Sequence, residues 1–198
     1  MHKAKSNTLV KDIILYPFPK SVNYPKINNV ISFSFITILL ISFTSIFQQN
    51  IVGQTTNTIL NTGETAPDFS LIDPENRKIT KENFIGKPLF IFFTATWCTP
   101  CQIGAQNLAK FDDEKGGDAF NVLIVFIDDK ETDNQFIGWK QKFGKDDWFI
   151  GKGIEMAKNY NVKVLDTKYV FDKDGIIKWI DTKPLEYSTI SPILSPLI

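Results

Sequence analysis

Residues 89–101 read LFIFFTATWCTPC, and the rest of the sequence can be interpreted outward from them. Five consecutive apolar residues, 89–93, indicate a strand that is covered on both faces of a sheet. The run leads into Cys98-Thr99-Pro100-Cys101, which contains both cysteines of the chain. Pro100 suits the first turn of a helix, because no helical hydrogen bond needs its missing N–H there. We therefore expect a buried strand to end, and a helix to begin, at two thiols.

The two cysteines are predicted to form a redox pair with unequal roles. The first N–H groups of a helix have no partners within the helix, and the helix dipole favours negative charge there. This field would stabilise a thiolate at Cys98, so we expect the pKa of Cys98 to fall below the free value of about 8.5. Cys101 lies one turn further and is close enough to attack a mixed disulfide on Cys98. Cys98 is thus the expected exposed nucleophile, and Cys101 the more buried resolving thiol.

A metal site and a purely structural disulfide are the alternative interpretations of the pair. Zinc bound by four protein side chains would need two more Cys or His ligands. The sole histidine of the sequence is His2, which lies before a predicted membrane segment. The apolar strand directly before the motif favours the redox interpretation over both alternatives. We predict neither a bound metal nor a cofactor.

Three motifs in order resemble a known family. Trp97-Cys98-Thr99-Pro100-Cys101 after an apolar strand is similar to thioredoxin-fold proteins. Residues 63–71 (GETAPDFSL) and 84–88 (FIGKP) look more specifically like the TlpA/ResA branch. That branch consists of membrane-anchored or exported thiol-disulfide oxidoreductases related to the peroxiredoxins. The resemblance covers residues 63–180 and implies an α/β fold: a thioredoxin-like three-layer sandwich around a central mixed β-sheet.

The N-terminal part of the sequence predicts a membrane anchor. Residues 1–28 are basic and contain three prolines, so we interpret them as a cytosolic tail. Residues 29–48 are interpreted as the anchor, because they contain the uncharged, apolar run 30–47, close in length to the ~20 residues that span a bilayer as a helix. The preceding lysines predict a single-pass orientation with the catalytic domain outside the cytoplasm. Residues 49–65 are interpreted as a flexible tether, and residues 66–198 as the thioredoxin-like domain.

Two alternatives compete with an uncleaved anchor. A cleavable signal peptide would need small residues at its cleavage site, and Ile51-Val52-Gly53 is a poor match. A buried core helix is disfavoured, because the segment is apolar on all sides and precedes the domain.

Within the domain, strands and helices are expected to alternate. Strands are predicted at residues 69–71, 78–79, 89–93, 122–127, 168–171 and 176–180, and helices after Pro100, at 132–143 and at 154–160. Residues 148–150 are expected to form either a short strand or a loop. The last segment, residues 183–198, contains three prolines and is expected to cap the sheet edge or to pack as an irregular tail.

The sequence departs from the family pattern opposite the cysteines. Most relatives carry a cis-proline there, and an ungapped alignment places Asp166, followed by Thr167, at this point. We expect a trans bond before Asp166, because a non-proline cis bond costs about 2.5–4 kcal/mol. A carboxylate there would repel the Cys98 thiolate and raise its pKa, or would act as a proton acceptor. An alignment slip, or an aspartate turned to solvent, is the alternative.

A second departure lies on the strand before the motif, and one prediction follows from the first departure. Phe92 occupies the position at which thioredoxins carry a buried acid, so the chain lacks that proton acceptor. If Asp166 repels the thiolate, an Asp166→Pro variant is predicted to have a more reactive Cys98.

The leading functional prediction is a membrane-anchored, extracytoplasmic thiol-disulfide oxidoreductase. The resemblance implies that it reduces protein disulfides, for instance in cytochrome c biogenesis. It also implies three kinds of partner: protein disulfide or dithiol substrates, a transmembrane electron donor, and the membrane bound by the N-terminal helix. The active-site surface is predicted to include Trp97, Thr99, Pro100, Asp166 and Thr167 around the two cysteines.

Several alternatives stay open at this point. A thioredoxin-fold interaction domain with weak catalysis, a copper-delivery module and a thiol peroxidase each fit part of the pattern. The direction of exchange is not fixed by the motif. The formal net charge of zero gives no indication of a nucleic-acid partner.

Overall fold

A computed structural model describes residues 59–198 of the chain. The predicted cytosolic tail and membrane anchor, and the tether as far as residue 58, lie outside the described residues. No helix within residues 59–198 is both long and apolar enough to cross a bilayer. Hydrogen bonding to the domain begins before the predicted start at Ala66: the N–H of Gly63 donates to the carbonyl of Ile177 over 2.8 Å, and Thr65 bridges Ile176.

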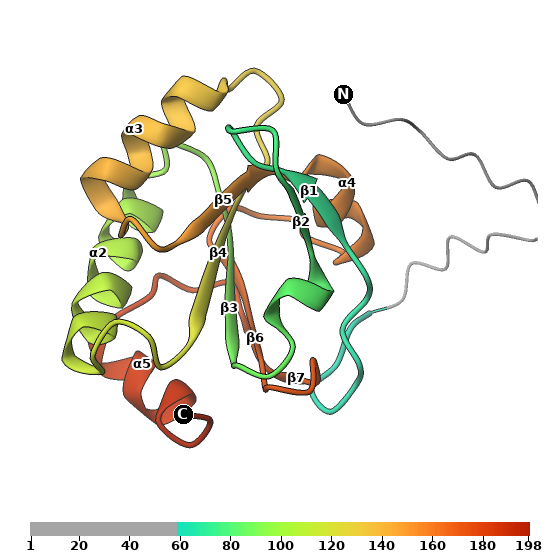
Figure 1. Ribbon diagram of the computed structural model, residues 1–198, viewed down its shortest axis with the longest axis vertical. Coiled ribbons are helices and arrows are strands. Elements are labelled where there is room, and N and C mark those ends of the chain that lie inside the picture. Colours follow the sequence, from blue (N-terminus) through green and yellow to red (C-terminus); the bar gives the residue numbers. More distant parts are fainter. Residues whose placement is uncertain (1–58) are drawn as a thin grey trace, which may run out of the picture. The chain divides into compact units, whose positions relative to one another are not determined.

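A seven-stranded mixed sheet forms the centre of this region, in the order β2-β1-β5-β4-β3-β6-β7 (Figure 1). The strands are β1 (Ser70–Ile72), β2 (Lys78–Thr80), β3 (Leu89–Thr94), β4 (Asn121–Phe126), β5 (Phe149–Lys152), β6 (Thr167–Phe171) and β7 (Ile177–Asp181). β3, β4 and β5 are parallel, and the other pairs are antiparallel. All six residues of β3 are buried, which confirms the predicted strand with two covered faces.

Helices cover both faces of the sheet, so the domain has three layers (Figure 1). One face carries α2 (Thr99–Glu114), α3 (Asp133–Phe143) and α5 (Tyr187–Leu194); the other carries α4 (Ile154–Asn159) and the 3-10 turn η1 (Lys81–Phe84). Side chains of β3 alternate between the layers. Phe90 and Phe92 pack on the α2 side, and Ile91 and Phe93 on the α4 side. The predicted α/β sandwich with a mixed sheet is confirmed.

The C-terminal segment differs from both sequence-based expectations. It forms helix α5, which packs against α2 instead of capping the sheet edge or running as an irregular tail. Ile190 and Leu194, four residues apart, share one face of this helix and are fully buried beside Leu185. Pro192 lies within the helix and had favoured the irregular prediction. Residues 149–152 form a strand, which decides between the two alternatives given for that stretch.

Candidate functional site: a disulfide at the start of helix α2

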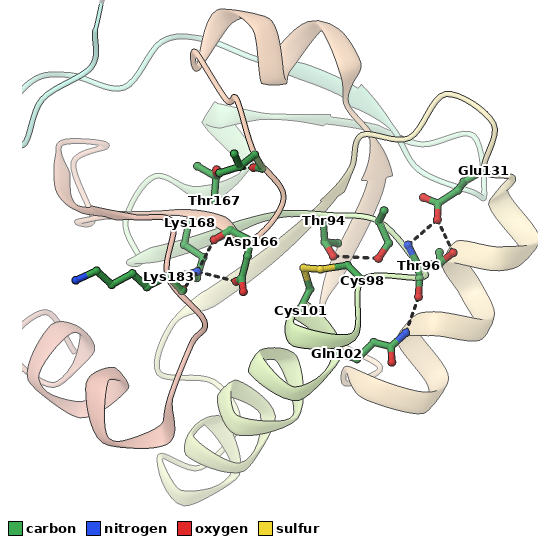
Figure 2. Close-up of a disulfide and its surroundings, with 12 residues drawn as sticks. Thr94, Thr96, Cys98, Cys101, Gln102, Glu131, Asp166, Thr167, Lys168 and Lys183 are labelled. Carbon is green, nitrogen blue, oxygen red and sulfur yellow. Dashed lines mark hydrogen bonds and ion pairs between the residues drawn. A yellow bond between two sulfur atoms is a disulfide. The ribbon is translucent and has the colours of Figure 1, made fainter.

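Cys98 and Cys101 are joined by a disulfide, with their Cα atoms 5.3 Å apart (Figure 2). The N–H of Cys98 donates to the carbonyl of Ala95 over 3.1 Å, which turns the chain back after β3. Cys98 is then the N-cap of α2, and Pro100 lies in the first turn. Pro100 needs no helical hydrogen bond at this position. The structure thus confirms that the strand ends and the helix begins at the two cysteines.

The predicted exposure of Cys98 needs a correction. Cys98 is 7% exposed and Cys101 is 0% exposed, so their order is as predicted, but Cys98 is also buried. The reason is that Cys98, bonded to Cys101, packs within the core cluster on the α2 side of the sheet. The accessible surface of the motif comes from its neighbours: Trp97 is 63% exposed, and Thr99 and Pro100 are exposed as well.

The loop that follows β4 holds one flank of the cysteine motif. The backbone N–H of Thr96 donates to Oε1 of Glu131 over 2.6 Å, and the Thr96 hydroxyl donates to the same oxygen. The amide of Gln102 donates to the Thr96 carbonyl over 2.7 Å. The indole N–H of Trp97 donates to Asp128 over 2.9 Å. These contacts fix the residues directly before Cys98, and Glu131, which the sequence had not indicated, is buried among them.

Asp166 lies on the other flank of the disulfide, away from Glu131 (Figure 2). It is 5% exposed, so the alternative of an aspartate turned to solvent is wrong. Its N–H donates to the carbonyl of Phe93 over 3.1 Å, and Phe93 pairs with Thr167 across β3 and β6. Every peptide bond of residues 59–198 is trans, as expected before Asp166. Asp166 and Thr167 therefore lie beside the strand end that leads to Cys98.

Asp166 is paired with a buried lysine that the sequence analysis missed. The ammonium of Lys168 lies 2.7 Å from Oδ1 of Asp166, and Lys168 is 0% exposed. The same ammonium donates to the backbone carbonyl of Asp166 and, over 2.6 Å, to that of Lys183. The predicted repulsion between Asp166 and a Cys98 thiolate treated the carboxylate as unpaired. In the structure, a cation at contact distance offsets the carboxylate charge.

Burial and pairing act on this pair in opposite directions. Burial raises the pKa of Asp166, while the hydrogen bond and the charge of Lys168 oppose that rise. Burial likewise lowers the pKa of Lys168, against the effect of Asp166. Among the described residues, Oδ2 of Asp166 is buried without a hydrogen-bond partner. One carboxylate oxygen is thus occupied by Lys168, and the other is free to accept a proton.

The family model for AhpC/TSA matches residues 62–180. The chain belongs to the AhpC/TSA family. Within this family, the ResA thiol-disulfide oxidoreductase of Bacillus thuringiensis subsp. konkukian is 35% identical over 117 residues. The match covers 57% of this chain and 65% of that protein, so the chain spans less than two thirds of the relative's length. The resemblance to the TlpA/ResA branch is confirmed.

Solved structures show the same fold at lower identity. A thiol:disulfide interchange protein of the thioredoxin family from Chlorobium tepidum TLS is 16% identical, with a TM-score of 0.59 over 71% of this chain and 99% of that one. Arabidopsis thaliana ScoI with copper bound is 19% identical, with a TM-score of 0.57 over 65% and 94% of the two chains. At these identities the likeness concerns the fold alone, which is thioredoxin-like.

A shallow groove adjoins the cysteine motif. Trp97 lines it together with Ile127 and Asp128 from the end of β4, and with Val164 and Leu165 from the segment before Asp166. Val164 is 51% exposed, so two large apolar side chains reach the surface in this groove. In a solvent-exposed position, such side chains favour contact with another chain.

Proposed function

We propose that this chain is a membrane-anchored, extracytoplasmic thiol-disulfide oxidoreductase that reduces protein disulfides. The observation that carries the proposal is the Cys98–Cys101 disulfide at the N-terminus of α2, directly after β3. Membership of the AhpC/TSA family and the identity with a ResA protein support the reaction class. The apolar run 30–47, and the lysines before it, support the anchor and its orientation.

The proposed reaction starts from the reduced pair. The Cys98 thiolate attacks one sulfur of a substrate disulfide, and the other substrate sulfur leaves as a thiolate that takes a proton from water. Cys101 then loses its proton and attacks the Cys98 sulfur, which closes the Cys98–Cys101 disulfide and releases the second substrate sulfur. Two electrons pass from the chain to the substrate. The free N–H groups at the start of α2 favour the thiolate at Cys98 during the first step.

The substrate is proposed to bind along the groove beside Trp97. An extended segment with an apolar side chain next to its cystine would contact Trp97 and Val164 while its disulfide approaches Cys98. Asp128 holds the indole in place through its 2.9 Å hydrogen bond. A rigid aromatic surface of this kind contributes contact area at a low entropic cost.

Turnover requires an electron donor. The two cysteines of the sequence form a single disulfide, so the oxidised chain must receive two electrons before it can act again. We propose a transmembrane protein as the donor, because the domain is proposed to lie outside the cytoplasm, away from the cytosolic thiol pool.

The activity is tested by the reduction of insulin disulfides with dithiothreitol as the electron source. The full chain is expected to accelerate the reaction well beyond dithiothreitol alone, and Cys98→Ser is expected to remove the acceleration. A wild-type chain that is no faster than free dithiothreitol would instead favour an interaction domain. The reduction potential of the pair, measured against glutathione, tests the direction: a potential near the reducing end of the roughly −270 to −120 mV range supports a reductase.

The location is tested in intact cells that express the full chain. A thiol reagent that cannot cross the membrane is expected to label Cys98 after mild reduction, and the labelled chain should sediment with the membranes. Labelling that appears only after lysis would contradict the extracytoplasmic location. Release into the soluble fraction of a shorter, labelled chain would contradict the anchor and favour cleavage after residue 48.

A further inference from the structure

We propose that Asp166, held in place by Lys168, accepts the proton of Cys101 when the disulfide closes. This inference rests on the proposed function, because it assigns the proton acceptor of that reaction's second step. It concerns a residue that stands where most relatives of the TlpA/ResA branch are expected to carry a proline.

The strand register places the pair on the same side of the sheet as the cysteines. Phe92 lies opposite Lys168 in the β3–β6 pairing, and the Lys168 ammonium lies 5.2 Å from the centre of the Phe92 ring. A Cβ atom added to Gly104 would lie 3.5 Å from the same ring. Gly104 is one turn after Cys101 on α2. The Phe92 ring therefore lies close both to the early part of this helix and to the ammonium of the Lys168–Asp166 pair.

Cys101 needs a proton acceptor other than bulk water. In the disulfide form its side chain is 0% exposed. The thiol must lose its proton before the sulfur can attack Cys98. Phe92 fills the position at which thioredoxins carry a buried acid. The other buried carboxylate near the motif, Glu131, also has an unpaired oxygen, Oε2. It lies on the far flank of the disulfide, however, and its Oε1 holds Thr96 (Figure 2).

Asp166 has a carboxylate oxygen available for this proton. Its Oδ1 is occupied by Lys168, whereas Oδ2 is buried and has no hydrogen-bond partner among residues 59–198. A buried acceptor without a partner is unusual and requires an explanation. A thiol hydrogen from the first turn of α2 supplies the missing donor in the reduced protein.

The charges around Asp166 suit an acceptor that is ionised before the step and neutral after it. Lys168 on β6 holds the carboxylate as an anion, whereas burial and the negative charge of Asp181 on β7 raise the pKa of Asp166. The Lys183 ammonium points away from the pair, and only its carbonyl contacts Lys168 (Figure 2). From α2, the positive end of the helix dipole faces the cysteines.

Atoms and electrons balance in the proposed step. The S–H bond of Cys101 breaks as an O–H bond forms at Oδ2 of Asp166. The bond between the Cys101 and Cys98 sulfurs forms as the bond from Cys98 to the substrate sulfur breaks. The substrate sulfur leaves with the electron pair and takes a proton from water, and Asp166 returns its proton to the Cys101 thiolate when the disulfide is next reduced.

The step can be timed with an aromatic disulfide whose thiolate product is coloured. The reduced full chain releases one thiolate when Cys98 attacks and a second when Cys101 attacks the Cys98 sulfur. In stopped flow, Asp166→Asn is expected to slow the second release on the order of 100-fold at neutral pH, the usual range for loss of a general base. The first release does not need the Cys101 proton, so its rate is expected to change far less than that of the second.

The pH dependence separates proton transfer from a structural effect. The rate of the second release in Asp166→Asn is expected to approach the wild-type rate as the pH rises, because hydroxide then removes the Cys101 proton. A distorted site would slow the second release equally at every pH, and that result would overturn the inference.

Two further variants control for the buried charge. Asp166→Asn leaves Lys168 buried without its partner, which can disturb the site. The double variant Asp166→Asn with Lys168→Met removes both charges and is expected to remain slow in the second release; a normal second release would overturn the inference. Asp112→Asn is the matched control. Asp112 is also buried beside a lysine, Lys145, with one oxygen unpaired, but it lies at the far end of α2.

Failure of the inference and failure of the proposed function give different results. A wild-type chain that shows no second release lacks an intramolecular resolving thiol, which contradicts the proposed function. A wild-type chain with both releases, together with an unchanged second release in Asp166→Asn, overturns the role of Asp166 alone.

Discussion

Replacing Cys101 with serine is expected to leave the chain covalently joined to its substrate through Cys98. The first attack does not involve Cys101, so the mixed disulfide still forms. Its resolution needs a second sulfur within reach, and in the wild-type chain this sulfur lies one turn along α2. Without it, the reaction stops after about one attack per chain. Intact-mass measurement of the full chain under non-reducing conditions, after incubation with a disulfide-bonded peptide, should show the adduct.

Cys98→Ser is the matched control for this experiment. It keeps a single thiol, but that thiol is Cys101, which lies in the first turn of α2 and is 0% exposed in the disulfide form. We expect little or no adduct from this variant, and loss of the Cys101→Ser adduct on addition of dithiothreitol. Equal adduct yields from the two variants would contradict the unequal roles assigned to the thiols.

The fold could be predicted largely because its elements are coded locally. The apolar run 89–93 is long enough for a central strand and too short for a helix of typical length. Thr132 caps α3 and shares reciprocal hydrogen bonds with Gln135, a pattern that is readable from spacing alone. Helix α5 was missed because the three prolines of residues 183–198 are a stronger local signal than the apolar spacing of Ile190 and Leu194, although packing against α2 stabilises the helix.

The site was predicted where it depends on neighbouring residues and missed where it depends on distant ones. Cys98 and Cys101 are three residues apart, and their geometry follows from the helix. Glu131 meets Thr96 across 35 residues of sequence, because β3 and β4 end at the same edge of the sheet. Lys168 stands within β6, and its sequence neighbours do not reveal that its side chain is buried instead of snorkelling to solvent.

Asp166 illustrates a third reason why part of the site could not be predicted from the sequence. The alignment correctly indicated that Asp166 lies opposite the cysteines. It did not predict the backbone conformation of this residue, because most relatives carry a proline there. Asp166 has φ = 66°, in the left-handed region that aspartate tolerates better than most residues. Proline is fixed near φ = −65°. The loop of this chain has therefore adopted a conformation that differs from the one a proline at position 166 would require.

Asp166→Pro is accordingly expected to destabilise the chain rather than to make Cys98 more reactive. The ring cannot reach φ = 66°, and the variant loses the N–H that donates to Phe93 over 3.1 Å. Loss of that hydrogen bond, with a buried carbonyl left unpaired, should cost about 1–3 kcal/mol of unfolding free energy before any backbone rearrangement. Urea unfolding of the oxidised full chain, followed by tryptophan fluorescence, measures the loss.

Asp166→Gly is the comparison that isolates the backbone. Both variants remove the carboxylate and leave Lys168 without its partner, so the charge effect is common to the two. Glycine adopts positive φ without strain and keeps its N–H. We therefore expect the glycine variant to be more stable than the proline variant by at least that margin. A proline variant as stable as Asp166→Gly, with faster alkylation of Cys98, would show that the loop can switch conformation. In that case the stability of the Asp166–Lys168 pair, and not the backbone, determines the shape of this flank of the site.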